Sequence, residues 1–177
     1  MLDYVERSGG INVAIVYTSD GKDATKTMAQ SIANGAKKAG ASTRVLLASE
    51  ASFDEDIRSW ADAIALGSGV YNGNPQPEML EFVDSFDFTT DLSGMVGCSF
   101  VTSGAPFAGA ETVAEALNRA MRIFRMVTIG GNNWKFVDGV VSDDDDISLE
   151  SVVESAEAQG ERLVRVASTM RSGSPVP

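Results

Sequence analysis

The sequence contains no histidine and a single cysteine, Cys98, among its 177 residues. Without histidine, the protein cannot contain a Ser-His-Asp triad, a Cys-His dyad, a histidine-ligated zinc ion or a histidine proton shuttle. With a single cysteine, it can form neither an internal disulfide nor a CxxC redox pair. Any redox chemistry of this protein therefore requires a bound cofactor.

Basic residues and long apolar runs are also scarce. The chain has 14 Lys and Arg residues against 25 Asp and Glu residues, so its formal net charge is −11. This charge argues against general binding to nucleic acid or to an anionic membrane, and it permits docking to a basic protein partner. No run of about 18 apolar residues occurs, and residues 1–10 lack the apolar segment of a signal peptide. We therefore expect no membrane span and a cytoplasmic location.

Short β-branched runs alternate with amphipathic segments along the chain. Strands are predicted over residues 11–17, 42–47, 61–67, 95–101 and 126–129, the last resumed or extended near residues 136–141. Helices are predicted over residues 24–40, 77–86 and 111–124 and along an apolar stripe from Leu149 to Met170, with a short helix or turn over 54–60. This alternation predicts an α/β fold, an open doubly wound parallel sheet in one domain over residues 1–177. Residues 1–10 form an N-terminal arm and residues 172–177 a frayed tail in this prediction.

Ligands of open α/β sheets bind at the carboxyl ends of the strands, and three loops follow predicted strands there. The first loop, residues 18–25, is rich in hydroxyl groups and leads into a helix. A helix N-terminus suits a phosphate group, and the hydroxyls of Thr18, Ser19 and Thr25 can donate to phosphate oxygens. The alternative is a plain N-cap and turn, for which Ser, Thr and Asp are preferred. Two aspartates in this loop oppose an anion, and two nearby lysines offset them.

The other two loops are rich in small residues. Residues 67–75 contain three glycines and two asparagines, which permit close approach to a flat ligand, and Tyr71 can lie against an aromatic ring. The alternative is a turn-rich connection in which Tyr71 covers the following helix. In residues 102–112, backbone N–H groups can bind a polar ring edge, although Glu111 and Thr112 alternatively only begin a helix. Three such loops beside one parallel sheet favour a ligand site more than any one of them does.

Motifs in these loops resemble those of the flavodoxin-like family, and more specifically its WrbA-like flavoprotein branch. Thr18, Gly21, Thr25 and Ala29 match the phosphate-loop pattern S/T-x-x-G-x-x-x-T-x-x-x-A. Residues 66–79 are similar to the segment G-S/T-P-x-x-x-G-N-x-x-x-x-M, with Gly69 in place of the proline. Residues 97–130 are similar to a block with a glycine-rich loop, a Glu-Thr pair and a helix that leads into strand five.

The resemblance implies a five-stranded parallel sheet in the order 2-1-3-4-5 that binds FMN. Carried over to matching positions, it implies that the ribityl phosphate is held by Thr18, Ser19, Gly21, Ala24 and Thr25. It implies that the isoalloxazine is contacted by Ser68, Val70, Tyr71, Asn72 and Gly73. The other side of the flavin is then lined by Ser103, Gly104, Ala105 and Gly109.

Three functions are consistent with these features. The first is an FMN-dependent oxidoreductase that passes electrons from NAD(P)H to a quinone or a similar acceptor, since no side-chain catalytic set is present. The second is a flavodoxin-type electron carrier that docks on a basic redox partner, which the net charge favours. The third is a flavin-free partner-binding module. The branch also contains dimers and tetramers, so a homo-oligomer is a further expectation. The run Asp143–Asp146 lacks the DxDxDG pattern of a calcium loop, and no metal site is predicted.

Overall fold

A parallel sheet forms the centre of the computed structural model, which describes residues 9–19, 21, 23–53, 55–89, 91–105, 108–131, 140–142 and 149–173. Its strands lie in the order β2-β1-β3-β5-β6. Their bounds are Asn12–Tyr17 (β1), Ser42–Leu47 (β2), Ala63–Tyr71 (β3), Val96–Thr102 (β5) and Val127–Thr128 (β6). Each neighbouring pair in this order is parallel. The predicted α/β fold and strand order are confirmed.

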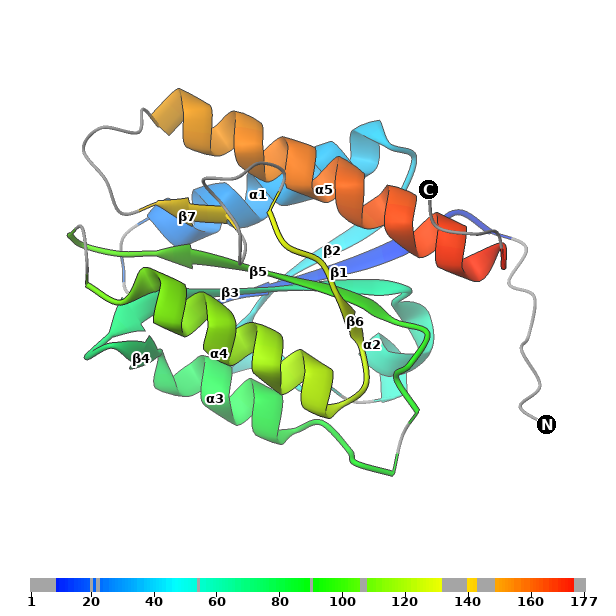
Figure 1. Cartoon of the computed structure of the whole chain (residues 1–177), viewed down its shortest axis with the longest axis horizontal. Coiled ribbons are helices and arrows are strands. Elements are labelled where there is room, and N and C mark those ends of the chain that lie inside the picture. The colour runs from blue at the N-terminus through cyan, green and yellow to red at the C-terminus, as the bar shows by residue number, and fades with distance from the viewer. Residues whose placement is uncertain are drawn as a thin grey trace.

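Helices cover both faces of the sheet (Figure 1). One face carries α1 (Ala24–Lys38) and α5 (Leu149–Arg171), and the other carries α3 (Pro77–Asp84) and α4 (Ala110–Ile123). The short elements η1 (Ala48–Glu50) and α2 (Glu55–Trp60) connect β2 to β3. Among the described residues, no helix is both long and apolar enough to cross a bilayer.

The fifth predicted strand consists of two short pieces. β6 pairs with the start of β5 at Val96 and Gly97, and β7 (Val140–Ser142) pairs with its end from Phe100 to Thr102. The predicted resumption near residues 136–141 therefore agrees with β7 at residues 140 and 141, while residues 132–139 lie outside the described part. The predicted N-terminal arm up to residue 8, the acidic run 143–146 and the tail from residue 174 also lie outside it.

The end predicted for the third strand, at Gly67, is wrong. β3 continues to Tyr71 because it pairs with β5 as far as Gly69 and then turns back as a hairpin. The returning strand is β4 (Asn74–Pro75), antiparallel to the end of β3. The second loop is therefore partly strand, and Ser68 lies in the sheet.

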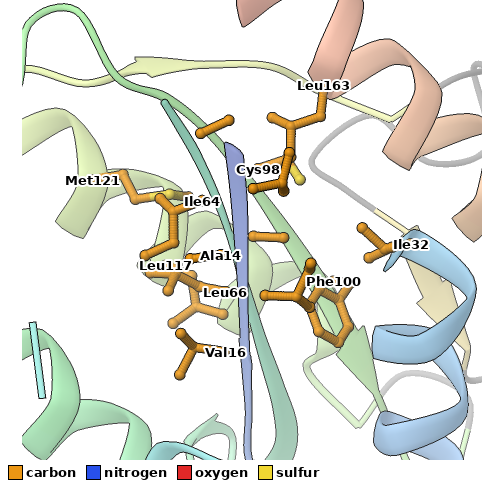
Figure 2. Close-up of a cluster of buried hydrophobic side chains, with 14 of the residues drawn as sticks. Ala14, Val16, Ile32, Ile64, Leu66, Cys98, Phe100, Leu117, Met121 and Leu163 are labelled. Carbon is orange, nitrogen blue, oxygen red and sulfur yellow. The ribbon is translucent and has the colours of Figure 1, made fainter. Parts of the chain in front are cut away.

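The core is formed by apolar side chains that alternate between the two faces of the sheet. Figure 2 shows Cys98 of β5 facing Leu163 and Phe100 of β5 pointing toward α1 on one side, and Leu66 of β3 facing Leu117 on the other. All five are 0% or 1% exposed. This packing fixes the central strands, and with them the strand ends that carry the three candidate loops.

Candidate functional site

Three stretches of chain meet at the carboxyl edge of the sheet. They follow or end the neighbouring strands β1, β3 and β5. The first is joined to the second directly, because the Thr18 amide donates to the Gly67 carbonyl at 3.0 Å. The structure therefore brings together the three stretches that the sequence analysis selected, although 77 residues separate Thr25 from Thr102.

Two buried hydroxyl groups join the first stretch to the third. The Oγ1 atoms of Thr25 and Thr102 lie 2.6 Å apart, and these residues are 3% and 8% exposed. Only one of the two hydroxyls can donate to the other, so one hydroxyl hydrogen of the pair remains uncommitted among the described residues. A buried donor needs an acceptor, and a phosphate oxygen of a ligand would satisfy it.

The side chain of Gln76 joins the first stretch to the second. Its Oε1 atom accepts a hydrogen bond from the Thr18 hydroxyl and another from the Gly69 amide at 3.3 Å. Thr18 is 1% exposed and Gln76 is 9% exposed, so these polar groups are shielded from water. Gln76 was not among the predicted site residues, because its partner Thr18 is 58 residues away in the chain. No local pattern signals a contact of that separation.

Ser68, predicted to contact the isoalloxazine, uses its hydroxyl within the protein. The Oγ atom accepts a hydrogen bond from the backbone N–H of Gln76 at 2.9 Å and donates one to the Gly69 carbonyl at 2.7 Å. The residue is 0% exposed. Its side chain therefore stabilises the turn from β3 into β4 and is not directed at the surface of the site.

The tip of the second stretch is a tight hairpin. Asn72 and Gly73 have φ angles of 49° and 77°, the left-handed backbone of a type I′ turn, and the residues on either side pair as Tyr71 with Asn74. The Asn-Gly pair was a sequence signal for this hairpin that the loop interpretation missed. Tyr71 is 55% exposed at this tip, so its ring is available to a ligand.

The hairpin tip lies against the start of α4. Gly109 has a φ of 97° and precedes α4, and a Cβ built on it would lie 3.6 Å from the Gly73 Cα. Within the third stretch, the Ser103 hydroxyl donates to the Ala105 carbonyl at 2.7 Å and closes a local turn. The second and third stretches therefore line one continuous edge, with Val70 and Gly73 half-buried and Gly104 and Ala105 exposed.

The phosphate-loop residues are open to solvent on this edge. Ser19, Gly21 and Ala24 are exposed, and the Ser19 hydroxyl accepts from the Gly21 amide at 3.3 Å. The N-cap residue of α1, Asp23, makes no side-chain hydrogen bond to the helix. The first turn of α1 is therefore not capped by its own N-cap side chain, which leaves its N–H groups for another acceptor. Asp20, Lys22 and Phe107 lie outside the described residues.

Residues 51–139, half of the chain, match the family of NADPH-dependent FMN reductases. The chain belongs to the NADPH-dependent FMN reductase family. The matched segment includes two of the three stretches described above, the β3–β4 hairpin and the loop before α4. FMN is the cofactor that this family membership assigns to the protein, in agreement with the resemblance seen in the sequence. No curated protein sequence matches the chain.

Solved structures share the fold of this FMN reductase family member. A WrbA-like flavodoxin from Agrobacterium tumefaciens superposes with a TM-score of 0.72 at 22% identity, covering 91% of this chain and 99% of that one. A flavodoxin from the domain Archaea gives a TM-score of 0.68 at 22% identity, covering 88% and 99%. Rubredoxin oxygen:oxidoreductase from Desulfovibrio gigas gives 0.72 at 14% identity, covering 93% of this chain and 38% of that one. At these identities the comparisons establish the flavodoxin-like fold.

The donor set at the edge fits FMN. The uncommitted hydroxyl hydrogen of the Thr25–Thr102 pair suits a phosphate group, and the exposed ring of Tyr71 suits a flat aromatic group. Both features lie at the carboxyl ends of neighbouring parallel strands, where ligands of this fold class bind. A single ligand with a phosphate at one end and an aromatic ring at the other matches both.

Proposed function

We propose that this protein is an FMN-dependent oxidoreductase that passes electrons from NAD(P)H to a quinone or a similar acceptor. The observation that carries the proposal is the convergence of a phosphate-suited helix start and an exposed aromatic hairpin at one sheet edge. Family membership supports FMN as the ligand of that edge. The single cysteine supports a cofactor as the redox group, since no CxxC redox pair can form.

The phosphate end of FMN would be held at the start of α1. Thr25 and Thr102 supply one hydroxyl hydrogen between them, and Gly21 and Ala24 are exposed residues of the same loop, of which the Gly21 amide already donates to the Ser19 hydroxyl. Partial positive charge at the N-terminus of α1 strengthens this binding. Ser19 adds an exposed hydroxyl, whereas the hydroxyl hydrogen of Thr18 is already donated to Gln76. Thr18 would therefore act on the phosphate through its backbone.

The isoalloxazine would lie between the hairpin and the loop before α4. Val70, Tyr71, Asn72 and Gly73 would form one wall, and Ser103, Gly104, Ala105 and Gly109 the other. The committed hydroxyl of Ser68 leaves only its backbone for contact. The positive φ angles at Asn72 and Gly73 turn the hairpin tightly and let its backbone approach a planar ring.

Bound FMN supplies hydride and electron transfer, while the protein binds and orients it. Val70 and Tyr71 would shield one face of the ring from water. In the loop of residues 103–105, Gly104 and Ala105 are exposed. Backbone N–H groups of this loop would be able to donate to polar atoms of the ring.

The test is an FMN titration of the purified protein, followed by an assay of NADH and NADPH oxidation with a benzoquinone acceptor. We expect quenching of flavin fluorescence on binding and turnover above that of free FMN at equal concentration. Saturable FMN binding without added turnover would reject the enzymatic half of the proposal. Failure of FMN to bind would reject the whole proposal and favour a partner-binding module.

The net charge supports a second candidate, a flavodoxin-type electron carrier. A charge of −11 steers an acidic protein toward a basic redox partner. Exposed carboxylates near the candidate edge include Asp23 and Glu111. Stopped-flow reduction by a flavodoxin reductase distinguishes this candidate, because steered rates fall as salt rises. Rates that do not change with ionic strength would reject it.

A further inference from the structure

The side chain of Gln76 points away from the helix that it precedes. Gln76 is the N-cap residue of α3, yet it makes no side-chain hydrogen bond to that helix. Its Oε1 atom instead accepts from the Thr18 hydroxyl and from the Gly69 amide. An N-cap side chain usually accepts from the first turn of its own helix. The side-chain amide of Gln76 therefore contacts Thr18, directly after β1, and Gly69 of β3.

These contacts form a closed triangle. The Gly69 amide also lies 3.2 Å from the Thr18 Oγ1 atom, so its single hydrogen is shared between Thr18 and Gln76. A Cβ built on Gly69 would lie 3.2 Å from the Gln76 Oε1 atom, so glycine at this position makes room for the amide. All three residues are buried, so a donor or acceptor that loses its partner here is costly.

The triangle lies between the two loops that would hold the two ends of FMN. Thr18 directly precedes the exposed residues of the phosphate loop. Gly69 directly precedes Val70 and Tyr71, the first residues of the ring-binding hairpin. The hydrogen bonds that Gln76 accepts from Thr18 and Gly69 form a bridge between the phosphate loop and the hairpin. The distance between these two loops therefore depends on that bridge.

We propose that Gln76 is a positioning residue for FMN. It acts through Thr18 and Gly69, setting the spacing between the phosphate loop and the hairpin without touching the cofactor. This inference rests on the proposed function, because it presupposes that FMN binds at this edge.

The experiment is a double-mutant cycle of Gln76→Met and Thr18→Val. Methionine keeps the length of the glutamine side chain and removes the acceptor, and valine removes the hydroxyl donor. We expect each single variant to weaken FMN binding about tenfold, which corresponds to about 1.4 kcal/mol, because FMN must then realign the two loops that the bridge no longer holds. The dissociation constant of the double variant for FMN should be about that of the single variant with the lower affinity, because both changes break the same bridge. The visible circular dichroism of bound FMN should also change in both.

The matched control is Gln159→Met. Gln159 is a second buried glutamine, 0% exposed and on α5, and its Nε2 atom donates to the Gly130 carbonyl at 3.1 Å. We expect this control to lower the melting temperature without changing the FMN dissociation constant or the flavin dichroism. If Gln76→Met does not fold, Thr18→Val breaks the same bridge from the other side.

Two outcomes would overturn the positioning role while FMN binding stands. One is Gln76→Met binding FMN within about twofold of wild type while its melting temperature falls, which is a purely structural effect. The other is losses that multiply in the double variant, which means that the residues act independently. A wild-type protein that does not bind FMN overturns the proposed function, and this role with it. The wild-type titration alone identifies that case.

Discussion

The hydroxyl oxygens of Thr25 and Thr102 lie 2.6 Å apart inside the protein, at the start of α1 and the end of β5. The pair contains two hydroxyl hydrogens, and the bond between them uses one. The remaining hydrogen gives a buried donor whose acceptor, in the proposed function, is the FMN phosphate. Substitutions at this pair therefore report directly on the phosphate end of the site.

We expect Thr25→Val to weaken FMN binding about tenfold, because one charge-assisted hydrogen bond to phosphate is lost. Riboflavin has no phosphate, so its affinity should stay close to that of wild type. The measurement is a pair of fluorescence titrations with FMN and riboflavin. The control is Thr27→Val, two residues after Thr25 on the same helix. It should leave both affinities unchanged. Equal losses for FMN and riboflavin in Thr25→Val would place the threonine away from the phosphate.

Tyr71 supplies the second prediction. Its ring is 55% exposed at the hairpin tip, so Tyr71→Ala should change the melting temperature of the cofactor-free protein very little. FMN affinity should fall about two- to tenfold, since an aromatic pair contributes about 0.5–1.5 kcal/mol beyond the area it buries. Phe88→Ala is the matched control, because Phe88 is 73% exposed and stacks on Phe124 outside the candidate edge. Unchanged FMN affinity in Tyr71→Ala would exclude the ring from the site.

The close packing of α1 on α5 supplies the third prediction. A Cβ on Gly35 would lie 1.8 Å from the Glu157 carbonyl oxygen, and one on Gly160 would lie 2.1 Å from the Ile32 carbonyl oxygen. Replacing glycine by alanine in a helix usually stabilises it by up to about 1 kcal/mol. Here we expect Gly35→Ala and Gly160→Ala to destabilise the protein by about 1–3 kcal/mol or more, because the helices must separate.

Urea denaturation measures this effect through the free energy of unfolding. Asn34→Ala, at an exposed position of α1, is the control and should be neutral or slightly stabilising. Alanine variants at Gly35 and Gly160 that match wild type in stability would show that the two helices are not in such close contact.

The buried thiol of Cys98 supplies the fourth prediction. Burial raises the pKa of this thiol from its ordinary value of 9.0 to about 12. Above pH 9 the unfolded chain loses this proton while the native protein keeps it, so stability falls as pH rises from about 9 to about 12. Below pH 9 both states keep the proton and the contribution is constant. We expect a loss of about 1.4 kcal/mol per pH unit within this window.

The measurement compares urea denaturation of wild type and Cys98→Ala at several pH values, because other groups also titrate in this range. Above pH 9, the unfolding free energy of wild type should fall relative to that of Cys98→Ala. As a second readout, the native thiol should resist iodoacetamide at pH 9, and the urea-unfolded chain should react. Rapid alkylation of the native protein would contradict the buried position of Cys98.

Local patterns in the sequence were sufficient for most of the fold. The β-branched run at residues 11–17 and the apolar spacing in residues 24–40 predicted β1 and α1 within two residues. Burial on both faces of a central strand produces a continuous apolar run, which is visible without any partner. The end of β3 was misplaced because Gly67, Ser68 and Gly69 look like a loop, whereas pairing with β5 keeps them in the sheet.

The candidate site was only partly predictable. Thr25, Tyr71 and Gly109 belong to loops that strand order alone brings together, since consecutive βα turns of neighbouring strands share one edge. Gln76 was not predicted, and the sequence did not indicate that the Ser68 hydroxyl is used within the protein, because both depend on side-chain contacts that no spacing rule describes.

The sequence by itself determined the α/β class, the alternation of elements, the fact that any redox chemistry needs a bound cofactor, and the candidate loops for such a ligand. These follow from composition and from periodicities that act over a few residues. The tertiary structure decided which hydroxyls are committed and which remain free. Thr18 meets Gln76 across 58 residues and Thr25 meets Thr102 across 77, and only the packed sheet brings such groups within hydrogen-bond distance.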